Sequence, residues 1–131
     1  MILEVDILSK TPIYQQIMDK IIEAIVKGEL KNGDPLPSVR QLAGELGINM
    51  HTVNKAYNIL KREGYVSIHQ RKGVVVTGKP KADAEYGEDL CLRLRTLLIE
   101  GYSKGVSTSR LREISESILR ELDGKKEDEE R

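Results

Sequence analysis

Two amphipathic segments, "SVRQLAGEL" and "NMHTVNKAYNILKR", are separated by only two residues, of which Gly47 is the first. The first segment opens with Ser38, and a glutamine three residues later completes the spacing of a capping box. Gly47 favours the end of that helix, and Asn49 is a good N-cap for the next one. We therefore predict helices over about residues 38–46 and 50–62, joined by a tight turn.

Segments on either side of this pair predict another helix and a hairpin. Thr11 followed by Pro12 fits an N-cap with proline at the first helical position, and isoleucines four residues apart then predict a helix over about 12–27. "KNGDPLP" predicts a loop. "YVSIH" and "VVVTG" are β-prone runs separated by "QRKG", the pattern of a hairpin with a basic tip. This order predicts a mainly α fold with a small β wing, an N-terminal winged helix-turn-helix.

The second half of the chain predicts two further helices. After the linker "GKPKAD", leucines at helical spacing predict a helix over about 84–101. Ser107 or Thr108 could cap a last helix, which is expected to end at Gly124. The charged run "KKEDEER" predicts disorder. The expected parts are the winged helix-turn-helix at 10–79, a two-helix region at 80–123 and a disordered tail at 124–131.

These two C-terminal helices carry one apolar stripe each, and such helices cannot close a core alone. A second copy of the chain across a twofold axis would cover both stripes in a small helical bundle. We therefore expect a homodimer that is formed by a short C-terminal two-helix dimerisation region. The expected interface residues are Leu90, Leu94, Leu97, Leu98, Leu111, Ile114 and Ile118.

Charge is unevenly distributed, although the whole chain has a net charge of zero. Residues 1–80 carry 11 basic and 8 acidic side chains, whereas residues 81–131 carry 10 and 13. Within residues 35–80 there are seven basic and two acidic side chains, a local net charge of +5. Such a local excess indicates an anionic partner.

The helix predicted over 50–62 has an outer face of the same character. At about 100° per residue, its apolar residues fall on one side and its polar and basic residues on the other, with no acid before Glu63. Amides and cations suit a helix that enters the major groove of duplex DNA, because cations neutralise phosphates and Asn or Lys side chains bond base edges. The apolar residues are Val53, Ala56, Tyr57 and Leu60, and the outer residues are His51, Asn54, Lys55, Asn58 and Arg62.

"LPSVRQLAGELGINMHTVNKAYNILKREGYV" followed by "RKGVVV" resembles the DNA-binding domain of the GntR family of bacterial transcription regulators, with "PIYQQI" in its first helix. "TVNKAY" and "GVSTSRLREI" resemble the YtrA-like branch, whose members have a short two-helix dimerisation region instead of a large effector domain. The resemblance implies a dimeric repressor of a transporter-type operon or of its own operon. Its operator would be approximately palindromic, with half-sites about 34–36 Å apart or a multiple of that distance.

Carried over position by position, the resemblance implies DNA contacts at the start of the second helix, along the third helix and in the wing. Arg40 in "PSVR" would contact DNA, and Ser38 beside it can direct a helix N-terminus at a phosphate. The tip of the wing enters the minor groove in family members. The implied contact residues are Ser38, Arg40, Asn49, His51, Thr52, Asn54, Lys55, Arg71, Lys72 and Gly73.

Two positions depart from the family pattern. Many members have arginine where this sequence has Met50, and again where it has Asn54. The guanine contacts of those arginines therefore do not carry over. Because asparagine pairs best with N6 and N7 of adenine, we expect an operator richer in A·T at the position that Asn54 reads.

Composition argues against several other classes of protein. Cys91 is the only cysteine and is joined by only two histidines, so we expect no disulfide, metal or cofactor. Without paired carboxylates, a nucleophile with a base, or a phosphate loop, we expect no catalytic residues and no enzyme. There is no apolar run of roughly 18 to 20 residues, and "MILEVDILSK" carries acids where a signal peptide is basic. We expect a cytoplasmic protein with no membrane partner.

One alternative function stays open, a winged-helix adaptor that binds an acidic protein partner through the same basic helix. Affinity for duplex DNA that falls steeply with salt would distinguish the regulator from the adaptor. A small-molecule effector is also possible, of unknown identity. A pocket of roughly 300 Å³ is hard to build within about 50 residues, so we expect any effector at a dimer or domain interface.

Overall fold

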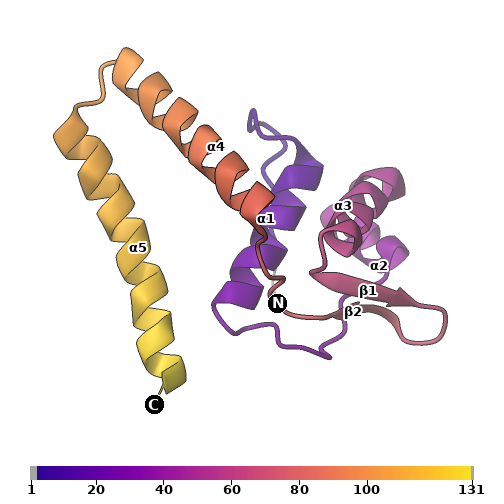
Figure 1. Cartoon of the computed structure of the whole chain (residues 1–131). Helices are drawn as coiled ribbons and strands as arrows, with labels where there is room; N and C mark the ends of the chain where they lie inside the picture. The colour runs from indigo at the N-terminus through magenta and orange to yellow at the C-terminus, as the bar shows by residue number, and fades with distance from the viewer. Residues whose placement is uncertain (1–2, 131) are drawn as a thin grey trace. The chain divides into compact units, whose positions relative to one another are not determined.

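The computed structural model describes the backbone of residues 3–130 and the side chains of residues 3–124. The chain forms two compact units, Met1–Pro80 and Lys81–Arg131. The first unit contains the helices α1 (Ile13–Val26), α2 (Val39–Leu46) and α3 (Met50–Arg62), followed by an antiparallel hairpin of β1 (Val66–His69) and β2 (Gly73–Val76) (Figure 1). The second unit contains α4 (Ala84–Ser103) and α5 (Thr108–Glu130). The predicted winged helix-turn-helix with a small β wing is confirmed.

The core of the first unit lies where α1, α3 and the hairpin meet. Four residues of α3 are completely buried, as the helical periodicity predicted, and each fully buried large side chain contributes about 1.5–3 kcal/mol to folding. From α1, the isoleucines of the predicted series are buried, except Ile13, which packs at the edge of the core. The buried members of these two sets are Ile17, Ile21, Ile25, Val53, Ala56, Tyr57 and Leu60.

The start of α1 differs by one residue from the prediction. Pro12, with φ −54° and ψ 147°, is the extended cap residue and not the first helical residue, and no side chain caps the helix. The side chain of Gln16 instead donates to the carbonyl oxygens of Thr11 (2.8 Å) and Asp6 (2.9 Å) and accepts from the Asp6 N–H (2.8 Å). This amide ties the preceding segment to the helix, although it does not cap the free N–H groups of its first turn.

The turn between α2 and α3 follows the prediction closely. The Ser38 Oγ accepts from the Gln41 N–H (3.0 Å), and the Asn49 Oδ1 accepts from the His51 N–H (2.7 Å). Only half of the capping box forms, because the Gln41 side chain donates to the Glu45 carboxylate (3.3 Å) on the next turn of α2. Gly47 ends α2 with φ +68°, a conformation that costs glycine little.

The loop before α2 has a role that the sequence did not reveal. Pro35 forms a bridge to Val75, the Leu36 N–H donates to the Val74 carbonyl (2.8 Å) and the Val76 N–H donates to the Asp34 carbonyl (2.8 Å). The loop therefore runs along β2 almost as a third strand. It fixes the wing to the segment that leads into α2.

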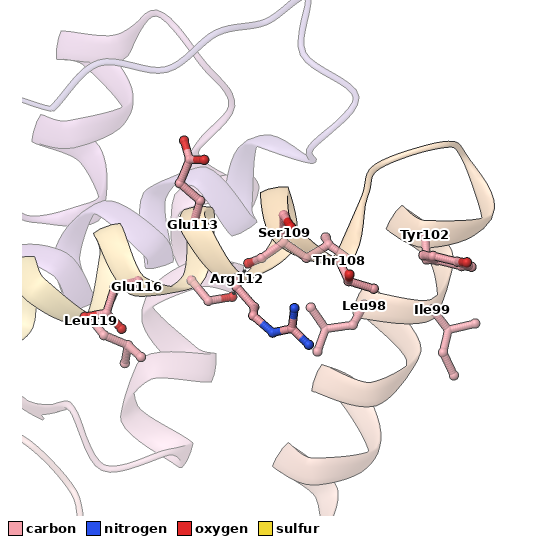
Figure 2. A pocket seen from close by; sticks show the side chains of 11 residues that line it. Leu98, Ile99, Tyr102, Thr108, Ser109, Arg112, Glu113, Glu116 and Leu119 are labelled. Atoms are coloured by element: carbon pink, nitrogen blue, oxygen red, sulfur yellow. Dashed lines mark hydrogen bonds between the residues drawn. The ribbon is translucent and has the colours of Figure 1, made fainter.

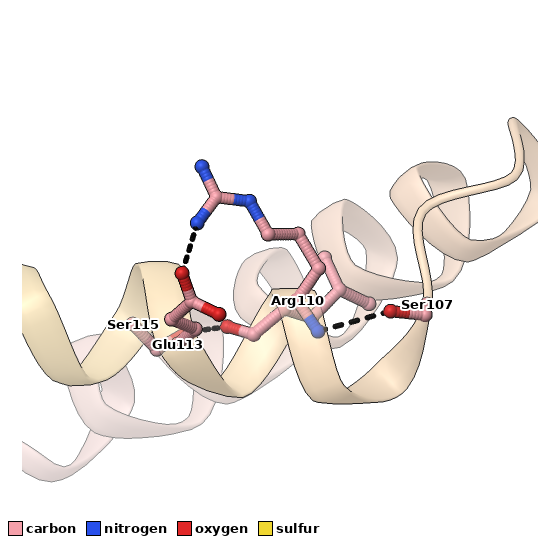
Figure 3. A network of polar contacts seen from close by, with 5 residues as sticks. Ser107, Arg110, Glu113 and Ser115 are labelled. Carbon is pink, nitrogen blue, oxygen red and sulfur yellow. Dashed lines mark hydrogen bonds and ion pairs between the residues drawn. The ribbon is translucent and has the colours of Figure 1, made fainter.

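The helices of the second unit begin at capping residues. The Asp83 carboxylate accepts from the Tyr86 N–H (2.8 Å) at the start of α4. Of the two candidates for α5, the cap is Ser107, whose Oγ accepts from the Arg110 N–H (3.1 Å) (Figure 3). Arg110 also pairs with Glu113 one turn further along the helix (2.6 Å), which holds the first turn of α5 together.

The end of α5 differs from the prediction. The helix does not stop at Gly124 but continues to Glu130, so the tail expected to be disordered over 124–131 is helical in its backbone up to that residue. Arg131 lies outside the described residues. The physical reason is that Lys and Glu are good helix formers, and a single internal glycine costs about 1 kcal/mol without ending a helix that continues on both sides.

Candidate nucleic-acid interface

The face of α3 that points away from the core carries the side chains expected to contact DNA. His51, Asn54 and Lys55 are exposed, and Thr52 is half-buried at the edge of this face. The opposite side of the helix is packed into the core of the first unit. The α3 residues are therefore fixed by packing on one side and open to a partner on the other.

The two cap residues among the expected contacts are already partly engaged. The Ser38 Oγ accepts a hydrogen bond from the Gln41 N–H in α2, and the side-chain Oδ1 of Asn49 accepts one from the His51 N–H in α3. Their remaining donors, the serine O–H and the asparagine NH₂, suit acceptors such as phosphate or base oxygens. Both residues are exposed at the start of their helices.

Tyr57 positions the start of α2 relative to α3. Its ring is completely buried, and its hydroxyl donates to the carbonyl oxygen of Pro37 (2.8 Å), directly before Ser38. Burial, with a smaller contribution from the carboxylate of Glu45, raises the pKa of the Tyr57 hydroxyl well above its usual value. The neutral hydroxyl thus links α3 to the segment "PSVR". The sequence predicted that Tyr57 is buried, but not that it makes this hydrogen bond.

The wing and the start of α2 complete a three-part surface. Arg40 is exposed in the first turn of α2, and Arg71, Lys72 and Gly73 are exposed at the tip of the hairpin. Gly73 has φ +73°, as expected for a tight hairpin turn. Because the loop before α2 pairs with β2, backbone hydrogen bonds link the hairpin that carries the wing tip to the segment that leads to Arg40.

The cations of this surface are not neutralised within the described part of the chain. Its ion pairs lie along α1, α4 and α5, for example Arg93 with Asp89 (2.9 Å) in α4. None of them engages the basic residues between 35 and 80, so that positive charge remains available to an anionic partner. These residues are Arg40, Lys55, Lys61, Arg62, Arg71, Lys72 and Lys79.

Lys55 has a contact that the sequence did not suggest. Its Nζ atom lies 3.9 Å from the centroid of the Tyr14 ring, which comes from α1. This is a close cation–π distance. The contact turns the lysine toward α1, whereas the other outer residues of α3 have no such partner among the described ring contacts.

The two-helix unit exposes an extensive apolar surface. Figure 1 shows α4 and α5 spreading apart from the loop that joins them, and no residue of α4 is buried. Two expected interface residues, Leu98 and Leu111, are half-buried inside this helical pair, where Leu111 packs close to Gly101. The other five expected residues are exposed, namely Leu90, Leu94, Leu97, Ile114 and Ile118. Further exposed apolar side chains that the helical stripes had not included are Leu92, Ile99, Tyr102 and Leu119.

An open groove of about 820 Å³ lies between α4 and α5 (Figure 2). Leu98 and Ile99 line one side of it, and Leu119 and the guanidinium of Arg112 belong to the other. The groove is open to solvent because the two helices diverge from their loop and do not pack along their length. The expectation that a ligand pocket of roughly 300 Å³ is hard to build within these residues therefore stays a prediction.

A helix-turn-helix with a polar and cationic outer face, followed by a basic hairpin, defines a winged helix-turn-helix protein of the DNA-binding class. Residues 13–76 match the family described as "Bacterial regulatory proteins, gntR family". The HTH-type transcriptional repressor YtrA of Bacillus subtilis (strain 168) is 34% identical over 129 residues, which cover 97% of this chain and 99% of that protein. The chain belongs to the GntR family, whose members regulate transcription and are not enzymes.

Two solved structures extend this comparison. YtrA from Sulfolobus acidocaldarius, a GntR-family transcription factor, is 47% identical and covers 76% of this chain and 99% of its own, with a TM-score of 0.62. The DNA-binding domain of AraR in complex with operator ORX1 is 26% identical over 59% of this chain and 95% of its own, with a TM-score of 0.51. Similarity to the two YtrA proteins confirms the YtrA-like character that the sequence motifs indicated.

The described residues include no helix that is both long and apolar enough to cross a membrane.

Proposed function

We propose that this protein is a homodimeric repressor that binds an approximately palindromic operator in double-stranded DNA. The observation that carries the proposal is that the seven basic side chains of residues 35–80, on α2, α3, the hairpin and the residues that follow it, form no ion pair with an acid in the described chain. Unpaired cations together with a polar helix face suit DNA, because cations bind phosphates and amide side chains bond base edges.

Each part of the surface has its own task in this proposal. The outer face of α3 enters the major groove, where His51 and Asn54 meet base edges and Asn49 and Thr52 contact the groove wall. Ser38 and Arg40 bind the phosphate backbone from the start of α2. The wing tip, which consists of Arg71, Lys72 and Gly73, binds phosphates and enters the minor groove.

The relatives support both the operator and repression. The Bacillus subtilis relative is named a transcriptional repressor, and the AraR domain was solved on its operator. By analogy, this chain represses by occupying an operator upstream of the genes that it controls, its own included. A bacterial regulator that binds an operator acts in the cytoplasm, because the DNA lies there.

The second unit supports the homodimer. Its exposed large apolar side chains are between 40% and 66% accessible, and so much apolar surface on two helices is costly unless another surface covers it. A second copy offers the same surface and requires no other component. Dimerisation would place two recognition helices on DNA and raise the affinity through effective concentration. An effector of unknown identity would bind at this dimer interface.

The test is the salt dependence of binding to a duplex taken from the DNA upstream of the protein's own gene. The logarithm of the affinity should fall linearly and steeply with the logarithm of the salt concentration, because bound phosphates release counterions. Negligible affinity for the duplex at every salt concentration would instead favour a protein adaptor.

Arg40→Ala tests whether the interface is correctly placed. The variant should bind the duplex more weakly while its thermal midpoint stays nearly unchanged, because Arg40 is exposed and makes no ion pair within the described residues. Fluorescence anisotropy measures the affinity and calorimetry the midpoint. Unchanged affinity would remove Arg40 from the interface.

A further inference from the structure

The contact between Lys55 and Tyr14 joins two helices of the first unit. Tyr14 belongs to the first turn of α1 and is half-buried, packed against the edge of the core. Lys55 is exposed on α3, and its ammonium nitrogen lies 3.9 Å from the centroid of the tyrosine ring. The ring is therefore held by the core, and the flexible lysine lies against it.

This contact identifies which edge of the recognition helix faces α1. At about 100° per residue, Lys55 and His51 lie about 40° apart on the outer face of α3, and Asn54 lies about 60° beyond His51, away from Lys55. The contact with Tyr14 draws the Lys55 ammonium from this face toward α1. On that side it can approach a phosphate beside the groove, whereas His51 and Asn54 remain free to meet base edges.

We propose that Tyr14 is a positioning residue that holds the Lys55 ammonium at the α1 edge of the recognition helix, so that Lys55 binds a DNA phosphate and reads no base. The inference rests on the proposed function. It specifies the role of Lys55, which the family resemblance had included only among the DNA contacts along the third helix, and it assigns a role to Tyr14.

The physical basis is preorganisation. The ring face attracts the cation on one side and leaves the N–H donors on the other side free for an acceptor. A lysine without this support would lose more side-chain freedom when it binds a phosphate. The interaction uses the ring face and not the tyrosine hydroxyl, so phenylalanine should serve equally well.

The experiment measures dissociation constants at several salt concentrations, on the operator duplex and on a scrambled duplex of equal length. Lys55→Ala should weaken binding to both duplexes by the same factor and reduce the slope of log affinity against log salt by about 0.9. Tyr14→Leu should weaken both by about two- to fivefold, and Tyr14→Phe should bind like the unchanged protein. In the Lys55→Ala background, Tyr14→Leu should have no further effect, because its target is gone.

Several results would overturn the inference. A loss confined to the operator in Lys55→Ala would make Lys55 a base reader. A loss of affinity in Tyr14→Phe equal to that in Tyr14→Leu would mean that the hydroxyl itself contacts DNA. Additive losses of affinity in the double variant would mean that Tyr14 and Lys55 act independently of each other. If the unchanged protein binds duplex with steep salt dependence, these results overturn this inference alone. If it binds no duplex, the proposed function fails as well.

A second measurement covers the case in which Tyr14→Leu does not fold. In the unchanged protein, the ε-methylene protons of Lys55 should show an upfield ring-current shift by NMR that persists when DNA is bound. Shifts typical of a solvated lysine, in the free protein or in the complex, would contradict the proposed contact.

Discussion

At the scale of single residues, Tyr57 shows how the core positions the DNA-binding surface. Its ring fills the core while its hydroxyl bonds to Pro37, next to the residues at the start of α2 that we assign to DNA. A buried hydroxyl needs such a partner, because an unpaired polar group in the core is costly. One side chain therefore contributes both to stability and to the placement of Ser38 and Arg40.

Tyr57→Phe should lower the free energy of unfolding by about 1–2 kcal/mol, because the Pro37 carbonyl loses its buried donor. The raised pKa adds a pH dependence. The unfolded chain releases the tyrosine proton near pH 10, while the folded chain retains it. The stabilisation that the neutral Tyr57 hydroxyl contributes is therefore complete below about pH 10 and is lost as the pH rises above it. Urea unfolding at pH 8 and above pH 10 measures both effects.

Tyr102→Phe is the matched control for that experiment. Tyr102 is 63% exposed, so removal of its hydroxyl should change the free energy of unfolding by less than about 0.5 kcal/mol. An equal loss of stability in both variants would show that the hydrogen bond to Pro37 is not the cause.

Asn54 leads to a prediction about the operator. Its amide matches adenine N6 and N7, whereas the arginine of many family members matches guanine. Selection from a random duplex library should therefore yield A·T at the pair read by Asn54, and Asn54→Arg should shift that pair toward G·C. A consensus with G·C at every contacted pair would contradict this role.

At the scale of secondary-structure elements, the wing is tied to the chain on both sides. β1 pairs with β2 from Val66 opposite Val76 to His69 opposite Gly73, and the loop before α2 pairs with the other edge of β2. The tip between the strands remains exposed and carries Arg71 and Lys72. A firmly held hairpin with a basic tip can contact phosphates without a large ordering cost.

The double variant Arg71→Ala with Lys72→Ala tests the wing as an element. It should weaken binding to all duplexes and reduce the salt slope by about 1.8, because two phosphate contacts are lost. The base preference selected from a random library should be unchanged at the positions that α3 reads. Retention of the full salt slope would exclude the wing tip from the interface.

At the scale of the whole molecule, the two units differ in how they bury apolar surface. The first unit encloses its own core, whereas the second has no buried residue in α4 and a groove between its helices. The second unit therefore depends on another surface in a way that the first does not. The proposed dimer through α4 and α5 would remove this difference.

Leu94→Asp should produce monomers, because a carboxylate within the apolar surface of α4 would be desolvated in the dimer without a partner. Operator affinity should fall by at least about 100-fold as the avidity of two linked domains is lost. Leu8→Asp is the control, because Leu8 is 90% exposed in the first unit and the substitution adds the same charge. Light scattering measures the mass of each, and a Leu94→Asp dimer would show that the interface lies elsewhere.

Sequence alone determined most elements of the fold and indicated a DNA-binding surface. Periodicity placed the buried face of α3, and caps and glycines placed the turn between α2 and α3, because these signals act between residues close in the chain. Uneven charge and family motifs indicated DNA. The same local signals misplaced the end of α5, where favourable propensity on both sides of Gly124 outweighed the glycine.

Only the tertiary structure decided which distant residues meet. The bond from Tyr57 to Pro37, the pairing of the loop with β2 and the contact of Lys55 with Tyr14 each join segments far apart in the sequence. No local periodicity encodes such contacts, because they arise when helices and strands pack around a common core. The same holds for Leu98 and Leu111, which the helical stripes grouped with the other expected interface residues but which are half-buried inside the α4–α5 pair.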